Sequence, residues 1–215
     1  ALTPDRAADF GPEHIPLEHL KQHIDFAFIA LHGRPGEDGT LQALFDLMRL
    51  PYNGSGRHSS ELTINKYETN ERPRAAGVAV AAHGIARKAD WQANAEALYA
   101  GLEAQFGYPL IAKPVDDGCS NAVKKLTTRT ELAAYCAALF RQTHDVPPEA
   151  QAVLRLLPNE EMPRKEELLV EAFIGPEPGT TLLEITVGVY TEYDSAGALD
   201  RKSTRLNSSH ANISY

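Results

Sequence analysis

The sequence is poor in cysteine and tryptophan, and it has no long apolar run. Only Cys119 and Cys136 are cysteines among its 215 residues, and neither stands in a spacing typical of metal ligands. Two cysteines cannot form a disulfide framework, so we expect the reducing cytoplasm as the compartment. No apolar stretch reaches the roughly 20 residues that a membrane-spanning helix needs. A starting methionine and a signal-peptide pattern are also missing, and we expect that the chain begins partway into its gene.

An excess of positive charge is missing as well. The chain has 29 acidic and 21 basic residues and a formal net charge of -8. This balance argues against nucleic acid or an anionic membrane as a partner, but it leaves room for a local basic pocket that binds a small anion. The hydrophobic fraction of 43% is ordinary for a globular protein, and the length allows one large domain or two small ones.

The first part of the chain predicts an α/β arrangement. The apolar run Ile24–Leu31 is short and aromatic, which favours a strand buried on both faces, as in a parallel sheet. After a loop, Asp38 is a candidate N-cap for a helix. Apolar residues recur at helical spacing in that helix, at Leu41, Leu44, Phe45 and Met48. The segment Leu50–Gly56 predicts a short strand that enters a turn, and the three elements suggest a βαβ unit.

Three further helices are predicted from hydrophobic spacing and end signals, at Ser59–Gly77, Trp91–Phe106 and Thr128–His144. Pro73 should kink or shorten the first of them. Thr128 and Glu131 have the spacing of a capping box, which marks the start of the last. The proline- and charge-rich segment Asp145–Glu167 has no pattern from which we predict a fold.

Short apolar runs predict the remaining strands, at Val78–Val80, Tyr108–Lys113, Asn121–Leu126, Leu168–Ile174 and Leu182–Tyr190. We expect the second and third of these to form a hairpin. The last two are joined by a short loop, so we expect them to pair antiparallel.

The last segment, Asp200–Tyr215, differs from the acidic chain before it. It lacks a hydrophobic period and is rich in serine, asparagine and basic residues, which is typical of a disordered tail. It also resembles the translation of a sequencing-library adaptor read in frame. On that interpretation the segment is a non-native tail, and the natural chain continued past Leu199. We therefore exclude it from functional reasoning.

A lysine at the end of an apolar strand is the first candidate for chemistry. Burying an unpaired ammonium group costs several kcal/mol, and Lys113 avoids this cost if an anion meets it there. The small residues Gly118, Cys119 and Ser120 follow, and their backbone N–H groups can approach an anion closely. The alternative is a lysine that reaches solvent at the strand end, and this loop alone does not decide between the two.

Other candidates have ordinary structural explanations when each is taken alone. Lys66 lies on a predicted helix, where a solvated lysine is the simpler interpretation. Glu171 and Glu184 are compatible with strand residues that face solvent. His32 follows an apolar strand, as hydrogen-bonded structural histidines often do, and Glu37 suits the start of a helix.

Several motifs follow one another in a fixed order. The chain contains HGRPGEDGTLQ and PYNGSG, then INKYETN and AAGVAV, then YPLIAKPVDDGCSNAV, and finally LLVEAFI and LLEITVGVY. They resemble, in order, motifs of the D-alanine–D-alanine ligases of the ATP-grasp superfamily, which are HGxxGEDGTxQ, PYxGSG, MDKxxxK, AAGIPVP, YPVIVKPAxEGSSxGV, VLVEEFI and GxEITVAVL. The resemblance runs from Asp25 to Tyr190.

The resemblance implies an α/β fold of the ATP-grasp class. A partial pre-ATP-grasp domain, which is Rossmann-like, would be followed by an incomplete α+β ATP-grasp domain. The implied boundaries are 1–56 for the first domain, 57–170 for the central ATP-grasp subdomain, 171–199 for the start of a truncated C-terminal subdomain, and 200–215 for the tail.

The resemblance also implies roles for single residues. Lys66 and Lys113 would hold the ATP phosphates from two sides, under a flexible lid loop of Gly118, Cys119 and Ser120. A linker strand would meet the adenine edge through its backbone, at Glu171, Ala172, Phe173 and Ile174. Glu184 would accept hydrogen bonds from the ribose hydroxyls.

The catalytic site implied by the resemblance contains His32, Glu37 and Ser120, with the first two in the pocket of the first amino-acid substrate. The chain departs from the family motifs at several positions, two of which bear directly on chemistry. Cys119 replaces the first serine of a Ser-Ser pair, and Asn70 replaces a lysine. These departures suggest a divergent relative whose amino-acid specificity differs. An alternative role of Cys119 as a nucleophile lacks a partnered base in the sequence.

The activity implied by the resemblance is ATP-dependent ligation of two D-alanines, or of a D-alanine-like acid and an amine, through an acyl phosphate for peptidoglycan synthesis. The cofactors would be ATP and Mg²⁺, and the metal ligands would follow Leu199, so we expect the fragment itself to be inactive. The partners would be ATP and amino acids, without nucleic acid or membrane. Whether the full-length protein forms a homodimer stays open. The alternatives are another ATP-grasp carboxylate–amine ligase and a non-catalytic nucleotide-binding module.

Overall fold

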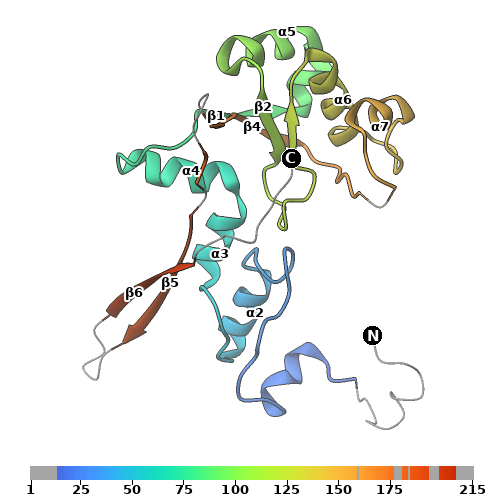
Figure 1. Cartoon of the computed structure of the whole chain (residues 1–215). Coiled ribbons are helices and arrows are strands. Elements are labelled where there is room, and N and C mark those ends of the chain that lie inside the picture. Colours follow the sequence, from blue (N-terminus) through green and yellow to red (C-terminus); the bar gives the residue numbers. More distant parts are fainter. Residues whose placement is uncertain (1–13, 159, 177–180, 184, 194–198, 207–215) are drawn as a thin grey trace. The chain divides into compact units, whose positions relative to one another are not determined.

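A computed structural model of the chain describes residues 14–158, 160–176, 181–183, 185–193 and 199–206. The chain divides into two compact units, Ala1–Ala172 and Phe173–Tyr215. The elements of the first unit are η1 (Leu17–Gln22), α2 (Thr40–Met48), α3 (Arg57–Ile64), α4 (Lys66–Ala75), β1 (His83–Arg87), α5 (Lys88–Phe106), β2 (Leu110–Pro114), β3 (Lys124–Leu126), α6 (Arg129–Leu139), α7 (Pro148–Leu154) and β4 (Glu167–Ala172) (Figure 1). The second unit contains β5 (Thr186–Tyr193) and β6 (Leu199–Leu206).

An antiparallel four-stranded sheet in the order β1-β4-β2-β3 organises the first unit (Figure 1). Burial alternates along β2, because successive side chains point to opposite faces of a sheet. Leu110 and Ala112 are buried on one face, while Ile111 and Lys113 are only partly buried on the other. The second face therefore has room for a charged side chain.

The main apolar core lies between the buried face of this sheet and the helices α5, α6 and α7. Its fully buried side chains include Leu110, Leu126, Leu132, Tyr135, Leu139, Leu168 and Val170. The helix α5 and the β2–β3 hairpin form close to where the sequence predicts them, although α5 begins three residues earlier than Trp91 and β3 begins at Lys124 instead of Asn121. Helix α6 begins as predicted, because the Thr128 side chain accepts a hydrogen bond from the N–H of Glu131, but it ends at Leu139.

The segment Ile24–Leu31 is not the doubly buried strand that the sequence predicts. Only a parallel bridge between Ala27 and Tyr52 forms there among the described residues, and Phe28 is 76% exposed. Ala27 packs with Phe45 of the predicted helix α2 in a small second apolar cluster. Backbone pairing in this segment is thus confined to one residue among those described, and the neighbouring side chains of Phe26 and Phe28 are exposed.

Helix starts explain two further differences. The N-cap of α2 is Gly39, with a φ of 88°, and Asp38 instead accepts a hydrogen bond from the N–H of Thr40. The helix predicted over Ser59–Gly77 is two helices, because Asn65 leaves the helical conformation and caps α4 through its side chain. Pro73 lies inside α4 and does not end it.

Two strand predictions and the prediction of a disordered tail are corrected by the observed strands. Val78–Val80 is not a strand, and β1 begins at His83 instead. Strand β4 pairs with β1 and β2, whereas β5 pairs with β6, so the predicted pairing of Leu168–Ile174 with Leu182–Tyr190 is wrong. The interpretation of Asp200–Tyr215 as disordered is wrong for residues 200–206, which belong to β6.

Helix α7 lies in the segment Asp145–Glu167, for which the sequence predicts no fold. The implied domain boundaries and the adaptor origin of the tail stay predictions.

Candidate functional site

Lys66 is the first residue of α4, and two hydrogen bonds join it to the chain that follows β2. Its backbone N–H donates to the carbonyl of Val115 at 2.8 Å, and its ammonium group donates to the carbonyl of Asp117. Burial and the nearby charge of Lys113 lower the pKa of Lys66 below its ordinary value. The protein therefore holds a half-buried ammonium group beside a second one, which disfavours its charge.

Lys113 projects from the partly buried face of β2 and forms an ion pair with Glu171 of β4, at 2.6 Å between Nζ and Oε2. The two residues are diagonal neighbours, since Glu171 pairs with Ile111 in the register of the sheet. Asn70, one helical turn after Lys66, donates from Nδ2 to the other oxygen of Glu171 at 2.8 Å. The contacts of Asn70 and Lys113 with Glu171 thus join α4 to one face of the sheet.

The loop between β2 and β3 has an unusual backbone. Cys119, Ser120 and Ala122 all have positive φ angles, between 52° and 55°. For a residue other than glycine this left-handed conformation costs about 1–2 kcal/mol, so contacts with the surrounding residues must hold the loop in place. The N–H of Asn121 donates to the carbonyl of Gly118 at 3.0 Å, and the exposed residues Cys119 and Ser120 form the tip.

A cavity of about 490 Å³ lies beside this loop and Lys66. Its lining includes Glu37, Gln42, Asn53, Lys66, Asp117 and Gly118. Two buried side-chain oxygens of the lining, Oε1 of Gln42 and Oδ2 of Asp117, have no hydrogen-bond partner among the described residues. Buried acceptors are usually satisfied, so these two oxygens indicate where a donor from a ligand or a water would bind.

Two of the predicted catalytic residues lie next to each other, on the loop before α2. Glu37 lines the cavity, and its Oε2 accepts a hydrogen bond from the N–H of Gly33 at 2.6 Å. A side chain on Gly118 would come within 3.5 Å of the same oxygen, so the two loops touch. His32 is 83% exposed, its Nδ1 is 3.9 Å from Oε1 of Glu37, and it is not part of the cavity lining.

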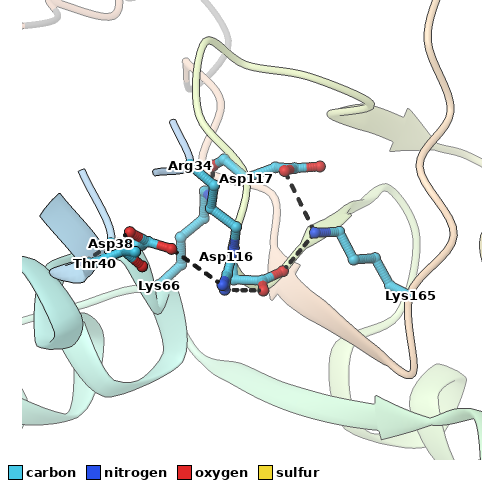
Figure 2. Close-up of polar contacts among 7 residues, drawn as sticks. All are labelled: Arg34, Asp38, Thr40, Lys66, Asp116, Asp117 and Lys165. Carbon is cyan, nitrogen blue, oxygen red and sulfur yellow. Dashed lines mark hydrogen bonds and ion pairs between the residues drawn. The ribbon is translucent and has the colours of Figure 1, made fainter. Parts of the chain in front are cut away.

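A group of charged side chains surrounds the base of the β2–β3 loop, and we call Arg34, Asp38, Asp116, Asp117 and Lys165 the ionic cluster. Figure 2 shows Arg34 between Asp38 and Asp116, and Lys165 between Asp116 and Asp117. Burial acts to raise the pKa of Asp116, but Lys165 and Arg34 outweigh it and leave that pKa below its ordinary value. Asp116 is therefore a well-stabilised carboxylate at neutral pH.

The remaining predicted site residues are divided between the two units. Glu171 and Ala172 end β4, and the N–H of Ala172 donates to the carbonyl of Ala82. Phe173 and Ile174 belong to the second unit. Glu184 lies outside the described residues. The roles of all these residues in nucleotide binding stay predictions.

The structure brings to this region several residues that sequence patterns did not single out, namely Arg34, Gln42, Asn53, Asp116, Asp117 and Lys165. Gln42 and Arg34 stand inside the HGRPGEDGTLQ motif, so that motif could have drawn attention to them. Asn53 makes hydrogen bonds with the backbone N–H and carbonyl of Ile29, and thereby holds one wall of the cavity. The ion pairs of Asp116 join distant segments, and no local pattern signals them.

The described part of the chain lacks both a metal-binding cluster and a membrane-spanning helix. It contains no group of three or more histidine, cysteine or acidic side chains able to hold a metal ion. It also contains no helix with the length and apolar character required to cross a membrane.

Two family models match the chain. The one described as D-ala D-ala ligase N-terminus matches residues 4–55, and the one described as D-ala D-ala ligase C-terminus matches residues 73–155. Together they match more than half of the chain. The first of these matches begins at residue 4, whereas the motif resemblance begins only at Asp25.

Curated relatives and solved structures agree with these matches. The D-alanine–D-alanine ligases of Dechloromonas aromatica and Aromatoleum aromaticum are 41% and 40% identical over 58% and 60% of this chain. The matched part spans 39% and 40% of those two proteins, about two fifths of their length.

The VanG D-Ala:D-Ser ligase from Enterococcus faecalis is similar at a TM-score of 0.55 and 26% identity, over 85% of this chain and 43% of its own. The Coxiella burnetii D-alanine–D-alanine ligase has a TM-score of 0.60 at 24% identity, over 96% of this chain and 54% of its own, which concerns the fold alone. These likenesses confirm the predicted partial α/β ATP-grasp fold class. On the two family models and these relatives, the chain belongs to the D-alanine–D-alanine ligase family.

Proposed function

We propose that this chain is the part of an ATP-dependent ligase that binds the nucleotide phosphates and the first amino acid, and that the ligase joins two D-alanines, or a D-alanine-like acid and an amine, for peptidoglycan synthesis. The observation that carries the proposal is the approach of Lys66 and Lys113 on one face of the sheet. Burial and the charge of Lys113 disfavour the protonated form of Lys66 even though Lys113 also pairs with Glu171, and a polyphosphate between the two lysines would stabilise both ammonium groups.

The two lysines have separate tasks in this proposal. Lys66 approaches from the start of α4 and Lys113 from β2, so a triphosphate between them would be held from two sides. Two point charges offset the triphosphate charge without imposing the fixed fork of arginine. ATP supplies the phosphoryl group that activates the carboxylate of the acid, and the amine then displaces phosphate.

The residues Gly118, Cys119 and Ser120 would cover the phosphates. Their side chains are small, and the left-handed backbone of Cys119 and Ser120 leaves N–H groups that can turn toward an anion. Such a cover excludes water from an activated carboxylate, which water would otherwise hydrolyse. We assign no metal ligand to the chain. Mg²⁺ is proposed with ATP on the family resemblance alone.

The cavity next to Lys66 suits the first amino acid. Its unsatisfied acceptors on Gln42 and Asp117, together with the carboxylate of Glu37, fit an ammonium group, which has three donors. Lys66 lines the same cavity, so an amino acid bound there would lie near the proposed phosphate site. The proposed compartment is the cytoplasm, in keeping with two cysteines that are both free.

The test is phosphate release by the longest gene product that carries this sequence, with ATP, Mg²⁺ and a panel of amino acids. We expect D-alanine alone to stimulate release, and Lys113→Met to reduce kcat/KM for ATP by at least about tenfold, since a close charged contact is worth about 1.5–3 kcal/mol. Cys119→Ser, which restores the residue of the family motif, is the control and should keep the activity. Stimulation only by an unrelated acid and amine would contradict the proposal.

A further inference from the structure

The loop between β2 and β3 is held at both ends by contacts of different kinds. At the far end, the hydroxyl of the fully buried Tyr135 donates to the carbonyl of Ala122 at 2.7 Å. At the near end, the loop is held by charge through Asp116. The backbone between these ends includes the left-handed residues Cys119 and Ser120, which need such support.

Asp116 uses both of its carboxylate oxygens. Oδ2 accepts from Arg34 at 2.6 Å, and Oδ1 forms an ion pair with Lys165 at 2.8 Å (Figure 2). Arg34 comes from the loop before α2, and Lys165 from the segment before β4. One carboxylate therefore fastens the base of the β2–β3 loop to two segments that are remote from it in sequence.

The neighbours of Asp116 connect this anchor to the proposed site. The backbone carbonyl of the next residue, Asp117, accepts a hydrogen bond from the ammonium group of Lys66. Gly118 then lies against Gly33 and Glu37, on the loop that carries Arg34. A shift of Asp116 would therefore move the partner of Lys66 and separate the two loops.

We propose that Asp116 is a positioning residue, which bridges Arg34 and Lys165 and thereby holds the near end of the β2–β3 loop in the conformation that presents Gly118–Ser120 and the Lys66 ammonium group to an anion. The anchoring itself does not depend on the identity of the ligand. The statement that the loop covers a bound anion rests on the proposed function.

The anchor should respond to salt, and this separates it from the far end of the loop. The side chain of Asp116 is 29% exposed, so dissolved ions reach its two ion pairs. Screening acts over about 10 Å at 0.1 M salt and about 3 Å at 1 M, and partly exposed pairs weaken accordingly. The bond from Tyr135 is buried and uncharged, so salt should leave it unchanged.

Hydrogen exchange of the full chain, followed by mass spectrometry, tests the anchor without any ligand. In Asp116→Asn we expect exchange over residues 117–123 to accelerate by at least about threefold, because losing two ion pairs favours local opening. Exchange in α6 should stay unchanged. Asp116→Glu keeps the charge and should restore most of the protection, and Asp145→Asn is the control, since Asp145 is exposed and pairs only with His144 among the described residues.

Raising the salt from 0.05 M to 1 M should accelerate exchange over 117–123 in the wild-type chain, and it should do so less in Asp116→Asn, where only the Lys165–Asp117 pair remains at this end of the loop. The salt dependence of the wild-type chain also tests the proposal if Asp116→Asn does not fold. The proposal is wrong if wild-type exchange over 117–123 is insensitive to salt. It is also wrong if Asp116→Asn accelerates α6 as much as the loop, because the residue would then only stabilise the fold.

A second titration separates this inference from the proposed function. We expect Asp116→Asn to weaken ATP binding by at least about threefold and to affect AMP less, since only the longer phosphate chain reaches both lysines. If the wild-type chain binds no ATP, the proposed function fails, while the exchange results still decide whether Asp116 holds the loop.

Discussion

At the scale of single residues, Lys66 carries a charge that the folded chain disfavours. Because burial and Lys113 lower its pKa, protonated Lys66 reduces stability at every pH below that pKa. Lys66→Met removes this disfavoured charge and should raise the stability of the ligand-free chain, by an amount reduced by the lost hydrogen bond to the carbonyl of Asp117. The gain should shrink as the pH rises through the Lys66 pKa, where the wild-type charge is lost.

Thermal unfolding with and without ATP measures this effect. ATP should raise the Tm of the wild type and not that of Lys66→Met. Lys21→Met is the matched control, because Lys21 is exposed and donates to the carbonyl of Arg49. An equal rise of Tm with ATP in the wild type and in Lys66→Met would count against a role for this lysine in binding an anion.

Asn70 offers a second test at this scale, since the family motif has lysine there. Asn70→Leu removes the hydrogen bond to Glu171 and should cost about 0.5–1.5 kcal/mol in the free energy of unfolding. Asn70→Lys can still reach the carboxylate and adds a charge, so we expect near-normal stability and ATP binding tighter by about threefold or more. Urea unfolding and an ATP titration of both variants distinguish these outcomes. Weaker ATP binding by Asn70→Lys would contradict the arrangement.

At the scale of elements, two glycines with opposite surroundings form a matched pair. A Cβ on Gly36 would come within 2.6 Å of the Leu31 side chain and 2.8 Å of its carbonyl oxygen. Gly36→Ala should therefore destabilise the chain by about 1–3 kcal/mol. Gly101 lies inside α5 with nothing within 4 Å of that position, so Gly101→Ala should stabilise it by about 0.5–1 kcal/mol. Urea unfolding midpoints that shift in the same direction would refute this account of the loop before α2.

The elements also show what local patterns can predict. The helices α2 and α5 and the β2–β3 hairpin follow their apolar spacing and turn residues. Asn65 divides a predicted helix because its side chain satisfies the first N–H groups of α4, and this capping competes with helical continuation. The partner of β4 could not be predicted from a short connecting loop, because β1 and β2 reach it from far along the chain.

The candidate site divides in the same way. Lys66 and Lys113 are predicted from their motifs, and the structure brings them together. The motif around Arg34 does not predict its ion pair with Asp116, and no pattern predicts Lys165, because each charge looks like a solvated surface residue until the fold joins them. Gln42 fits a helix pattern, and only its burial with an unsatisfied oxygen marks it as part of a site.

At the scale of the whole molecule, several carboxylates have pKa values below their ordinary range, and this predicts acid sensitivity. For Asp116 burial opposes the shift and Lys165 and Arg34 prevail, while the backbone N–H of Thr127 lowers the pKa of Glu131. A lowered pKa contributes stability above the ordinary value, here 3.8 for Asp and 4.5 for Glu. That contribution is lost as the pH falls through the folded values.

The free energy of unfolding should therefore fall as the pH drops below about 4.5, as urea titrations at several pH values would measure. Asp116→Asn should be less stable than the wild type at neutral pH, and the two curves should converge in acid. A difference that stays constant from neutral to acidic pH would show that the charge of Asp116 is not what stabilises the fold.

The most direct measurement for the central claim is ATP protection of lysine amines against acetic anhydride in the full chain, read residue by residue by mass spectrometry. The account predicts that ATP slows the labelling of Lys66 and Lys113 together, that AMP protects both much less, and that Lys21 is unaffected. Protection of only one of the two lysines, or of neither at saturating ATP, would contradict the claim that both hold a single nucleotide.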